Sequence, residues 1–198
     1  MRKYTLATLA AFVALSPALA QADGPSYSFL DAGYVVTDVD NFNKDVDGYL
    51  LRGSWEFMDN WFAYGRYVDQ STDVAGASLD VSQWSIGAGF AWPLNDGMDL
   101  YGKAGYVEAD ADVDSFNAHA NDNGYELSVG LRGLAMPQFE YEGAVNYTDL
   151  SDSGDTTSVA LAARWYFLPQ FSMGIEGEFG QDANSYGIGA RWNFGGGK

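Results

Sequence analysis

The stretch Tyr186–Phe194, YGIGARWNF, decides the fold of this chain. Every second residue of the stretch is apolar, whereas Arg191 and Asn193 occupy positions between the apolar ones. A repeat of two residues places alternate side chains on opposite faces of a β-strand. The stretch therefore predicts a strand with one apolar face and one polar face.

The same alternation recurs along the chain, separated by turn-forming or polar stretches. The ten alternating runs span about 27–37, 47–57, 61–69, 81–92, 98–107, 124–134, 138–148, 157–167, 170–179 and 184–194. The connections alternate as well, because four are short turns and five are longer polar stretches. This order predicts antiparallel hairpins in series. The expected fold is all-β, an antiparallel up-and-down barrel of about ten strands, with eight strands as the alternative count.

The two faces of these runs differ sharply in charge. One face carries no charged residue and holds all six tryptophans. The other face carries six of the eight basic residues that follow residue 20, together with eight carboxylates. If this face lines the barrel interior, it forms a lumen charge network, since buried charges need opposite charges as partners. The members of the predicted network are Asp31, Arg52, Glu56, Arg66, Asp99, Lys103, Glu126, Arg132, Glu140, Glu142, Arg164, Glu176, Glu178 and Arg191.

The placement of aromatic residues indicates which face points outward. The apolar face carries aromatic residues at both ends of the runs and small or aliphatic residues between them. Such rings prefer the two membrane interfaces, which predicts a transmembrane β-barrel rather than the alternative, a soluble periplasmic β-protein. The predicted aromatic girdles contain Tyr34, Tyr49, Trp55, Trp61, Tyr67, Trp84, Trp92, Tyr106, Tyr125, Tyr147, Trp165, Trp192 and Phe194.

The N-terminal residues 1–20, MRKYTLATLAAFVALSPALA, have the three parts of a signal peptide. Arg2 and Lys3 precede an apolar stretch, and Ala18-Leu19-Ala20 forms a cleavage site before Gln21. We expect export, cleavage after Ala20, a barrel over residues 21–194 and a flexible C-terminal tail over residues 195–198. The formal charge of −17 argues against nucleic acid as a partner. The chain has no cysteine, which excludes disulfides and thiolate chemistry.

Candidates for chemistry are few. His119 is the single histidine, and it lies in the longest polar stretch with Asp114 and Asp122 nearby. We interpret it as a loop residue, because a catalytic histidine needs a positioned partner. The pairs Glu140/Glu142 and Glu176/Glu178 resemble catalytic carboxylates, but Arg132, Arg164 and Arg191 offer them counter-charges across the lumen. The stretch DVDNFNKDVDG (residues 38–48) lacks the ligand spacing of an EF-hand. We expect no enzyme activity, no metal site and no cofactor.

The first hairpin carries a resemblance to a known family. The stretch SYSFLDAGYVVTDVDNFNKDVDGYLLRGS (residues 26–54) is similar to the Ax-type family of small outer-membrane and vesicle proteins. In pattern the whole chain resembles the outer-membrane β-barrel domain proteins of Gram-negative bacteria. Phe194 at the end of an alternating strand also resembles the signal that the barrel-insertion machinery reads, although residues 195–198 follow it here. The resemblance implies residence in the outer membrane, in contact with lipid and lipopolysaccharide.

These observations predict a monomeric outer-membrane barrel with a salt-bridged, largely plugged lumen. Its role would be structural or carried by the acidic surface loops, in which fifteen acidic residues gather. A narrow, porin-like channel for small solutes is the alternative, and a rim hydrolase that uses His119 is a weaker third.

Overall fold

The protein is a closed barrel of ten antiparallel strands. The computed structural model describes residues 24–40, 44–74, 77–113 and 118–194. The strands are β1 (Phe29–Val39), β2 (Val46–Met58), β3 (Trp61–Val74), β4 (Ala77–Asn95), β5 (Met98–Val113), β6 (Ala118–Met136), β7 (Phe139–Leu150), β8 (Gly154–Leu168), β9 (Phe171–Phe179) and β10 (Ala183–Asn193). The prediction of an all-β, up-and-down barrel with ten strands is confirmed, and the count of eight is wrong.

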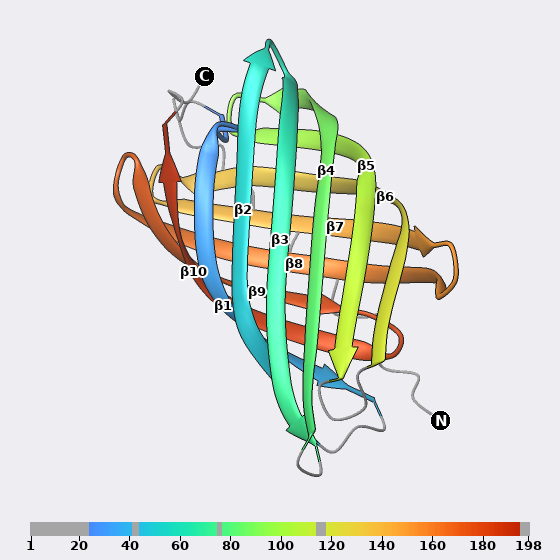
Figure 1. Ribbon diagram of the computed structural model, residues 1–198. Coiled ribbons are helices and arrows are strands. Elements are labelled where there is room, and N and C mark those ends of the chain that lie inside the picture. The colour runs from blue at the N-terminus through green and yellow to red at the C-terminus, as the bar shows by residue number, and fades with distance from the viewer. Residues whose placement is uncertain (1–23, 41–43, 75–76, 114–117, 195–198) are drawn as a thin grey trace, which may run out of the picture.

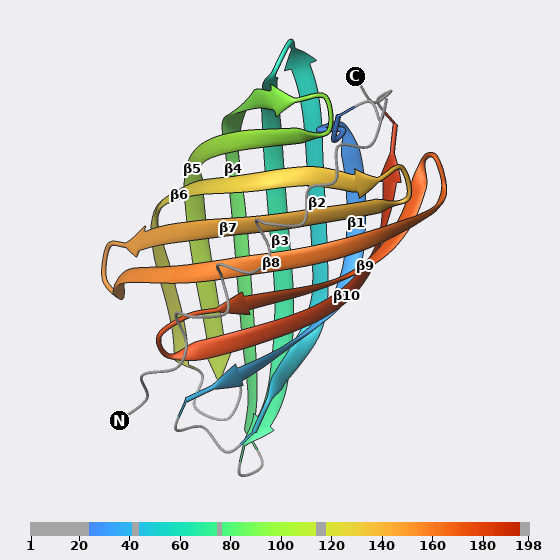
Figure 2. The same ribbon diagram turned by 180° about the vertical axis from the view of Figure 1, so that it is seen from behind.

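Each strand pairs with its neighbours in sequence, and β1 pairs with β10 to close the barrel. The closing register runs from Phe29 opposite Asn193 to Val39 opposite Ala183. The strands are strongly tilted, so that β1–β5 rise steeply on one side while β7–β10 cross behind them (Figures 1 and 2). Closure leaves no free strand edge, which is the condition for crossing a membrane with β-strands.

The four short turns lie at one end of the barrel, at the upper left of Figure 1. Each of these turns is accompanied by a shift in strand register, for example between Glu56 and Met58. Asn60 in the first turn has a φ of 68°, a left-handed conformation that asparagine tolerates better than most residues. We call this end the short-turn end, and the opposite end the long-loop end.

Two connections differ from the prediction of long polar loops. Strands β3 and β4 stay paired up to Val74 and Ala77, and strands β5 and β6 up to Val113 and Ala118. The end of the apolar alternation therefore marks where the outer face becomes polar, not where the strands end. Backbone pairing continues because the ladder needs no apolar side chains.

Several sequence predictions fall outside the described residues. These are the signal peptide (1–20), the tail (195–198) and part of the acidic stretch, residues 41–43. Within the described residues, no helix is long and apolar enough to cross a membrane.

Candidate functional site

The outer surface of the barrel is apolar and carries the aromatic residues that the sequence singled out. Twelve of the thirteen predicted girdle residues are exposed, and Tyr147 is half-buried. At the short-turn end the rings of Trp61 and Phe90 lie 5.0 Å apart, and at the long-loop end those of Trp84 and Tyr106 lie 5.4 Å apart. Exposed Leu, Ile and Val side chains lie between the two ends, for instance Ile175 and Ile188. This distribution suits a hydrocarbon band between two interfaces.

The interior near the short-turn end holds a layer of buried charges. We call this the charged floor, and it consists of Asp31, Arg132, Glu140, Arg164 and Arg191. The side chains of all five are between 1% and 3% exposed. They come from β1, β6, β7, β8 and β10, so the floor ties together strands from around the barrel.

Both carboxylates of the charged floor accept from several arginines. Arg132 donates to the two oxygens of Glu140 at 3.0 and 2.9 Å, and Arg191 donates to Glu140 at 3.1 Å. Arg191 also donates to Asp31 at 3.1 and 3.2 Å, and Arg164 Nη2 lies 3.0 Å from Asp31. The strand register explains one of these contacts, because Asp31 and Arg191 are direct partners across β1 and β10.

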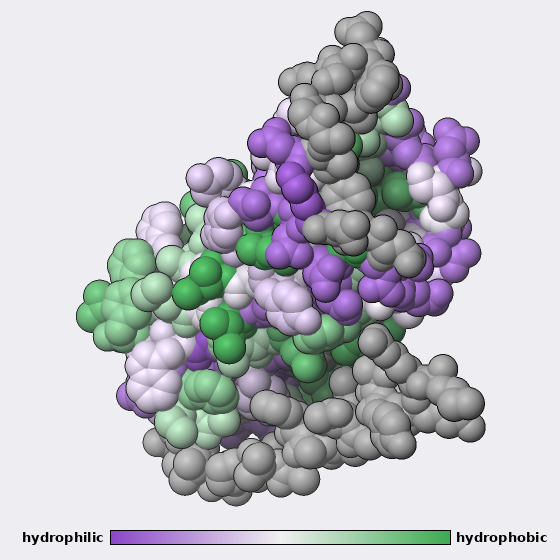
Figure 3. Space-filling view, turned by 90° about the horizontal axis from the view of Figure 1, so that it is seen from below, coloured by the Kyte–Doolittle hydropathy of each residue, from purple (hydrophilic) through white to green (hydrophobic). Residues whose placement is uncertain are grey.

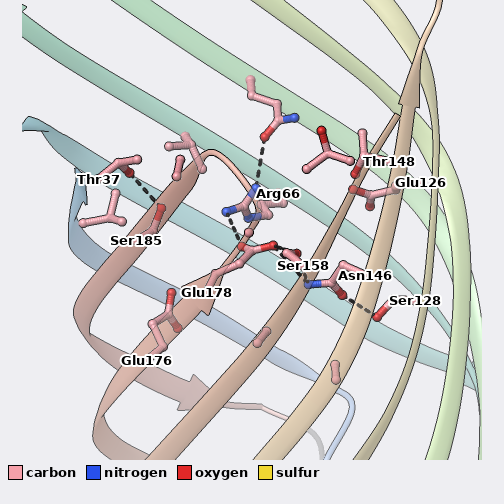
Figure 4. Close-up of a pocket in the computed structure, with 18 of the residues that line it drawn as sticks. Thr37, Arg66, Glu126, Ser128, Asn146, Thr148, Ser158, Glu176, Glu178 and Ser185 are labelled. Carbon is pink, nitrogen blue, oxygen red and sulfur yellow. Dashed lines mark hydrogen bonds and ion pairs between the residues drawn. The ribbon is translucent and has the colours of Figure 1, made fainter. Parts of the chain in front are cut away.

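A second tier of charges lies above the floor. Arg52 bonds to Asp31 at 3.0 Å and also to Glu176, so it connects the two tiers. Glu178 accepts from Ser158 at 2.6 Å and from Asn146 at 3.1 Å, and its other oxygen lies 3.8 Å from Arg66 Nη2. Figure 4 shows Arg66, Asn146, Ser158 and Glu178 gathered around one open space.

Inward tyrosines reach across neighbouring strands to carboxylates. Tyr64 on β3 donates to Glu126 on β6 at 2.7 Å, and Tyr101 on β5 donates to Glu142 on β7 at 2.6 Å. Tyr64 can do so because it passes over Gly87 and Gly105, where an added Cβ would lie 2.7 and 2.4 Å from its hydroxyl. The sequence analysis did not single out the glycines beneath these tyrosines.

The segment before β1 enters the lumen at the short-turn end. Tyr27 is 3% exposed and stacks on Phe62, with ring centroids 4.7 Å apart. The guanidinium of Arg132 lies over the Tyr27 ring, and that of Arg191 lies 3.8 Å from the centre of the Phe29 ring. The sequence predicted a strand from Tyr27, but β1 starts at Phe29 and the preceding residues cover the charged floor instead.

Above the floor the lumen is hollow toward the long-loop end. A cavity of about 510 Å³ lies there, and we call it the cup. Its other lining residues are neutral, and its charged ones are Arg52, Arg66, Lys103, Glu126, Glu142, Glu176, Glu178 and, at the mouth, Asp182. The lumen is therefore filled near the short turns and open space remains on the other side, which alternation alone did not indicate.

The remaining predicted network members lie in separate environments. Glu56 accepts a hydrogen bond from the backbone N–H of Asn60 and belongs to the first short turn. Asp99 is buried opposite Arg132 in the β5–β6 register. The Lys103 ammonium lies 4.9 Å from the centre of the Tyr64 ring.

His119 pairs with a carboxylate other than Asp122, one of the two that the sequence placed near it. It lies on β6 rather than in a loop, and its Nδ1 is 2.8 Å from Asp112. Asp114 lies outside the described residues. Within the described residues, no group of three or more His, Asp or Glu side chains is placed to hold a metal ion.

Asp122 instead anchors the turn between β7 and β8. Its carboxylate accepts from the Ser153 hydroxyl at 2.6 Å and from the backbone N–H groups of Ser153 and Asp152. These hydrogen bonds, that of the Ser153 hydroxyl most of all, hold the pKa of Asp122 below its usual range. A carboxyl with a lowered folded-state pKa stabilises the structure above its unfolded-state pKa, and this contribution is lost as the pH falls through the folded-state pKa.

We therefore expect Asp122→Asn to speed amide hydrogen exchange at Asp152 and Ser153 several-fold at pH 6. The difference from the unsubstituted protein should persist at pH 4 and vanish only in more acidic solution. Hydrogen exchange measured by NMR on the refolded barrel tests this, with Asp155→Asn in the same hairpin as the control. Equal exchange in both variants at pH 6 would contradict the anchoring role.

Carboxylates surround the long-loop end. We call this set the acidic rim, and its fifteen described members are Asp38, Asp40, Asp45, Asp47, Asp69, Asp73, Asp80, Glu108, Asp110, Asp112, Asp122, Asp149, Asp152, Asp155 and Asp182. Among the described residues of this end, Lys44 is the single lysine or arginine. Hydrophilic residues gather in a broad patch when the molecule is seen from this side (Figure 3).

Comparisons with known proteins agree with this architecture. A family model described as the outer membrane protein beta-barrel domain matches residues 5–167. No curated protein matches the chain significantly. Among solved structures, the NanC porin is 11% identical over 83% of this chain and 100% of its own, with a TM-score of 0.54.

Two further structures are similar over most of the chain. Ail, the attachment invasion locus protein of Yersinia pestis, was solved with the heparin analogue sucrose octasulfate. It is 18% identical over 84% of this chain and 97% of its own, with a TM-score of 0.48. The N-terminal β-barrel domain of Pseudomonas aeruginosa OprF is 11% identical over 86% and 100%, with a TM-score of 0.47. At these identities the likeness concerns the fold alone.

Proposed function

The chain belongs to the outer membrane protein β-barrel domain family and is an outer-membrane protein, and from this premise we propose that it is a non-conducting barrel. In this proposal the charged floor closes the short-turn end, and the acidic rim is displayed outside the membrane. The barrel serves as a stable membrane element whose biological role is carried by its surface hairpins. It acts without enzyme activity and as a monomer.

The observation that carries this proposal is the burial of the charged floor. Asp31 and Glu140 expose only 1% and 2% of their side chains, and both form ion pairs with arginines. Tyr27 and Phe29 cover the same layer from the short-turn side. An ion path would have to pass through groups that are already paired and packed, and opening it would leave buried charges without partners.

The proposal extends to export and insertion. Residues 1–20 act as a signal peptide that is cleaved after Ala20. The C-terminal strand with Phe194 is read by the barrel-insertion machinery. The aromatic girdles hold the barrel in lipid and lipopolysaccharide. The alternation of β10 and the exposure of Phe194 support the last two statements.

A narrow channel for small solutes is the second candidate. The cup favours it, because about 510 Å³ of the lumen is open above the floor. The two candidates differ in a single property, the continuity of the water path through the charged floor.

Planar-bilayer conductance of the refolded mature protein distinguishes them. We expect a silent bilayer, with heat-modifiable gel migration as the check that a folded barrel was added. Arg66→Ala, which widens the cup alone, should stay silent as well. Discrete current steps from the unsubstituted protein would overturn the non-conducting proposal and establish the channel.

A further inference from the structure

The cup has the size and the chemistry of a ligand site. Its volume of about 510 Å³ lies within the range of small-molecule pockets, about 300–1,000 Å³. The charged floor closes one side, so a molecule that enters from the long-loop end meets a polar wall rather than a passage.

The wall of the cup offers unused hydrogen-bond acceptors. Glu126 and Glu142 each accept a tyrosine hydroxyl on Oε1, and among the described residues their Oε2 atoms accept no hydrogen bond. The Oε2 of Glu178 lies 3.8 Å from Arg66 Nη2, too far for a hydrogen bond. Glu126 and Glu142 thus keep one oxygen each without a donor, and the Oε2 of Glu178 has only a long ion pair with Arg66.

The charges around the cup favour a cation. Apart from Asp182, which belongs to the acidic rim, the cup wall holds four carboxylates (Glu126, Glu142, Glu176 and Glu178) and three cations (Arg52, Arg66 and Lys103), which leaves one negative charge in excess. The acidic rim at the mouth adds fifteen carboxylates against Lys44 alone among the described residues. A cleft lined by one sign of charge concentrates molecules of the opposite sign and repels those of its own sign.

We propose that the cup binds small organic cations that carry several N–H donors, the chemistry of a polyamine. The ammonium groups of such a molecule would donate to the Oε2 atoms of Glu126, Glu142 and Glu178. The acidic rim would raise its local concentration at the mouth. This inference goes beyond the proposed function, because binding in the cup requires the cavity but not the absence of conductance.

Isothermal titration calorimetry with spermidine, on the refolded mature barrel in a zwitterionic detergent, tests the proposal. We expect one saturable site that weakens when NaCl is raised from about 0.05 M to about 0.5 M. Maltose, a neutral molecule of similar size, and citrate, an anion, should not bind. Glu126→Gln combined with Glu178→Gln should weaken spermidine binding at least about tenfold, as expected for lost charged hydrogen bonds.

A matched pair of variants separates the cup from the rim. Thr156 lines the cup and is exposed, whereas the next residue, Thr157, is exposed on the outer face. Thr156→Trp should fill the mouth and abolish the saturable site, while Thr157→Trp should leave it unchanged. Both variants keep every carboxylate of the rim.

Three results would overturn the proposal. The first is the absence of saturable spermidine binding. The second is spermidine binding by Thr156→Trp as tight as by the unsubstituted protein, and the third is maltose binding as tight as spermidine binding. The bilayer measurement is independent of all three, so a conducting barrel that binds spermidine would remove the proposed function and keep this site.

Discussion

Glu140→Ala should lower the free energy of unfolding by about 3–5 kcal/mol, the usual cost of removing one partner from a buried ion pair. Glu140 is fully buried and accepts hydrogen bonds from Arg132, Arg191 and the Tyr166 hydroxyl. Its removal leaves Arg132 without its bidentate carboxylate and Arg191 with Asp31 alone. The arginines cannot lose their charge to escape this penalty.

The measurement is a urea titration of the barrel in phospholipid vesicles. Tryptophan fluorescence reports unfolding, because the tryptophans lie on the outer face and leave the lipid when the barrel opens. Glu108→Ala is the matched control, since Glu108 accepts from Tyr106 and Asn121 at the rim. Glu108→Ala should lower the free energy of unfolding by less than about 1 kcal/mol.

A second variant keeps the experiment informative if Glu140→Ala does not fold. Glu140→Gln preserves the shape and part of the hydrogen bonding but removes the charge, so its cost should lie between those of the other two. Equal stability of Glu140→Ala and Glu108→Ala would show that the charged floor does not hold the strands together.

The sequence predicted the number of strands and the two faces because a period of two is a local property. Tyr186, Ile188 and Trp192 point outward whatever the neighbouring strands do, since adjacent side chains of a strand must alternate. The aromatic girdles could be predicted in the same way, from the positions of aromatic residues at the ends of each run.

The partners inside the lumen depend on the tilt and stagger of the strands, which a local pattern does not contain. Glu140 contacts the arginines that the sequence suggested, but Glu142 accepts from Tyr101 and Glu178 lies near Arg66. Contacts between direct register partners, such as Asp31 with Arg191, follow once the closing pair of strands is known.

The entry of residues 24–28 into the lumen left no signal in the sequence. These residues show no alternation of apolar and polar side chains. Tyr27 matches the inward positions of β1 only because it lies two residues before Phe29. Its position is decided by packing on Phe62 and Arg132, which lie on other strands. The cup likewise depends on the size of side chains from most of the ten strands.

The glycines beneath the inward tyrosines did leave a signal. Gly87 and Gly105 lie opposite each other on the inward faces of β4 and β5, between Tyr64 on β3 and Glu126 on β6. Because both of these inward-facing residues are glycines, the two adjacent strands leave a groove there. A long side chain from the next strand can cross it. Tyr64 fills that groove and links four strands by one hydrogen bond.

Gly105→Ala should therefore destabilise the barrel by about 1–3 kcal/mol, the usual cost of overpacking. The added Cβ would lie 2.4 Å from the Tyr64 hydroxyl and 2.6 Å from the Ile86 carbonyl oxygen. The tyrosine could move aside only by losing its hydrogen bond to Glu126. The Ile86 carbonyl oxygen could move only if strand β4 moved with it.

Gly102→Ala on the same strand provides the control for this substitution. Its added Cβ would face lipid, with the nearest atom, Cζ3 of Trp92, at an ordinary 3.7 Å. Because glycine weakens a strand, this variant should be neutral or slightly stabilising in the same urea titration. If Gly105→Ala were equally neutral, Tyr64 would have to tolerate displacement, and the link from β3 to β6 would not contribute to stability. A loss confined to Gly105→Ala would establish that the groove is required for the tyrosine to cross it.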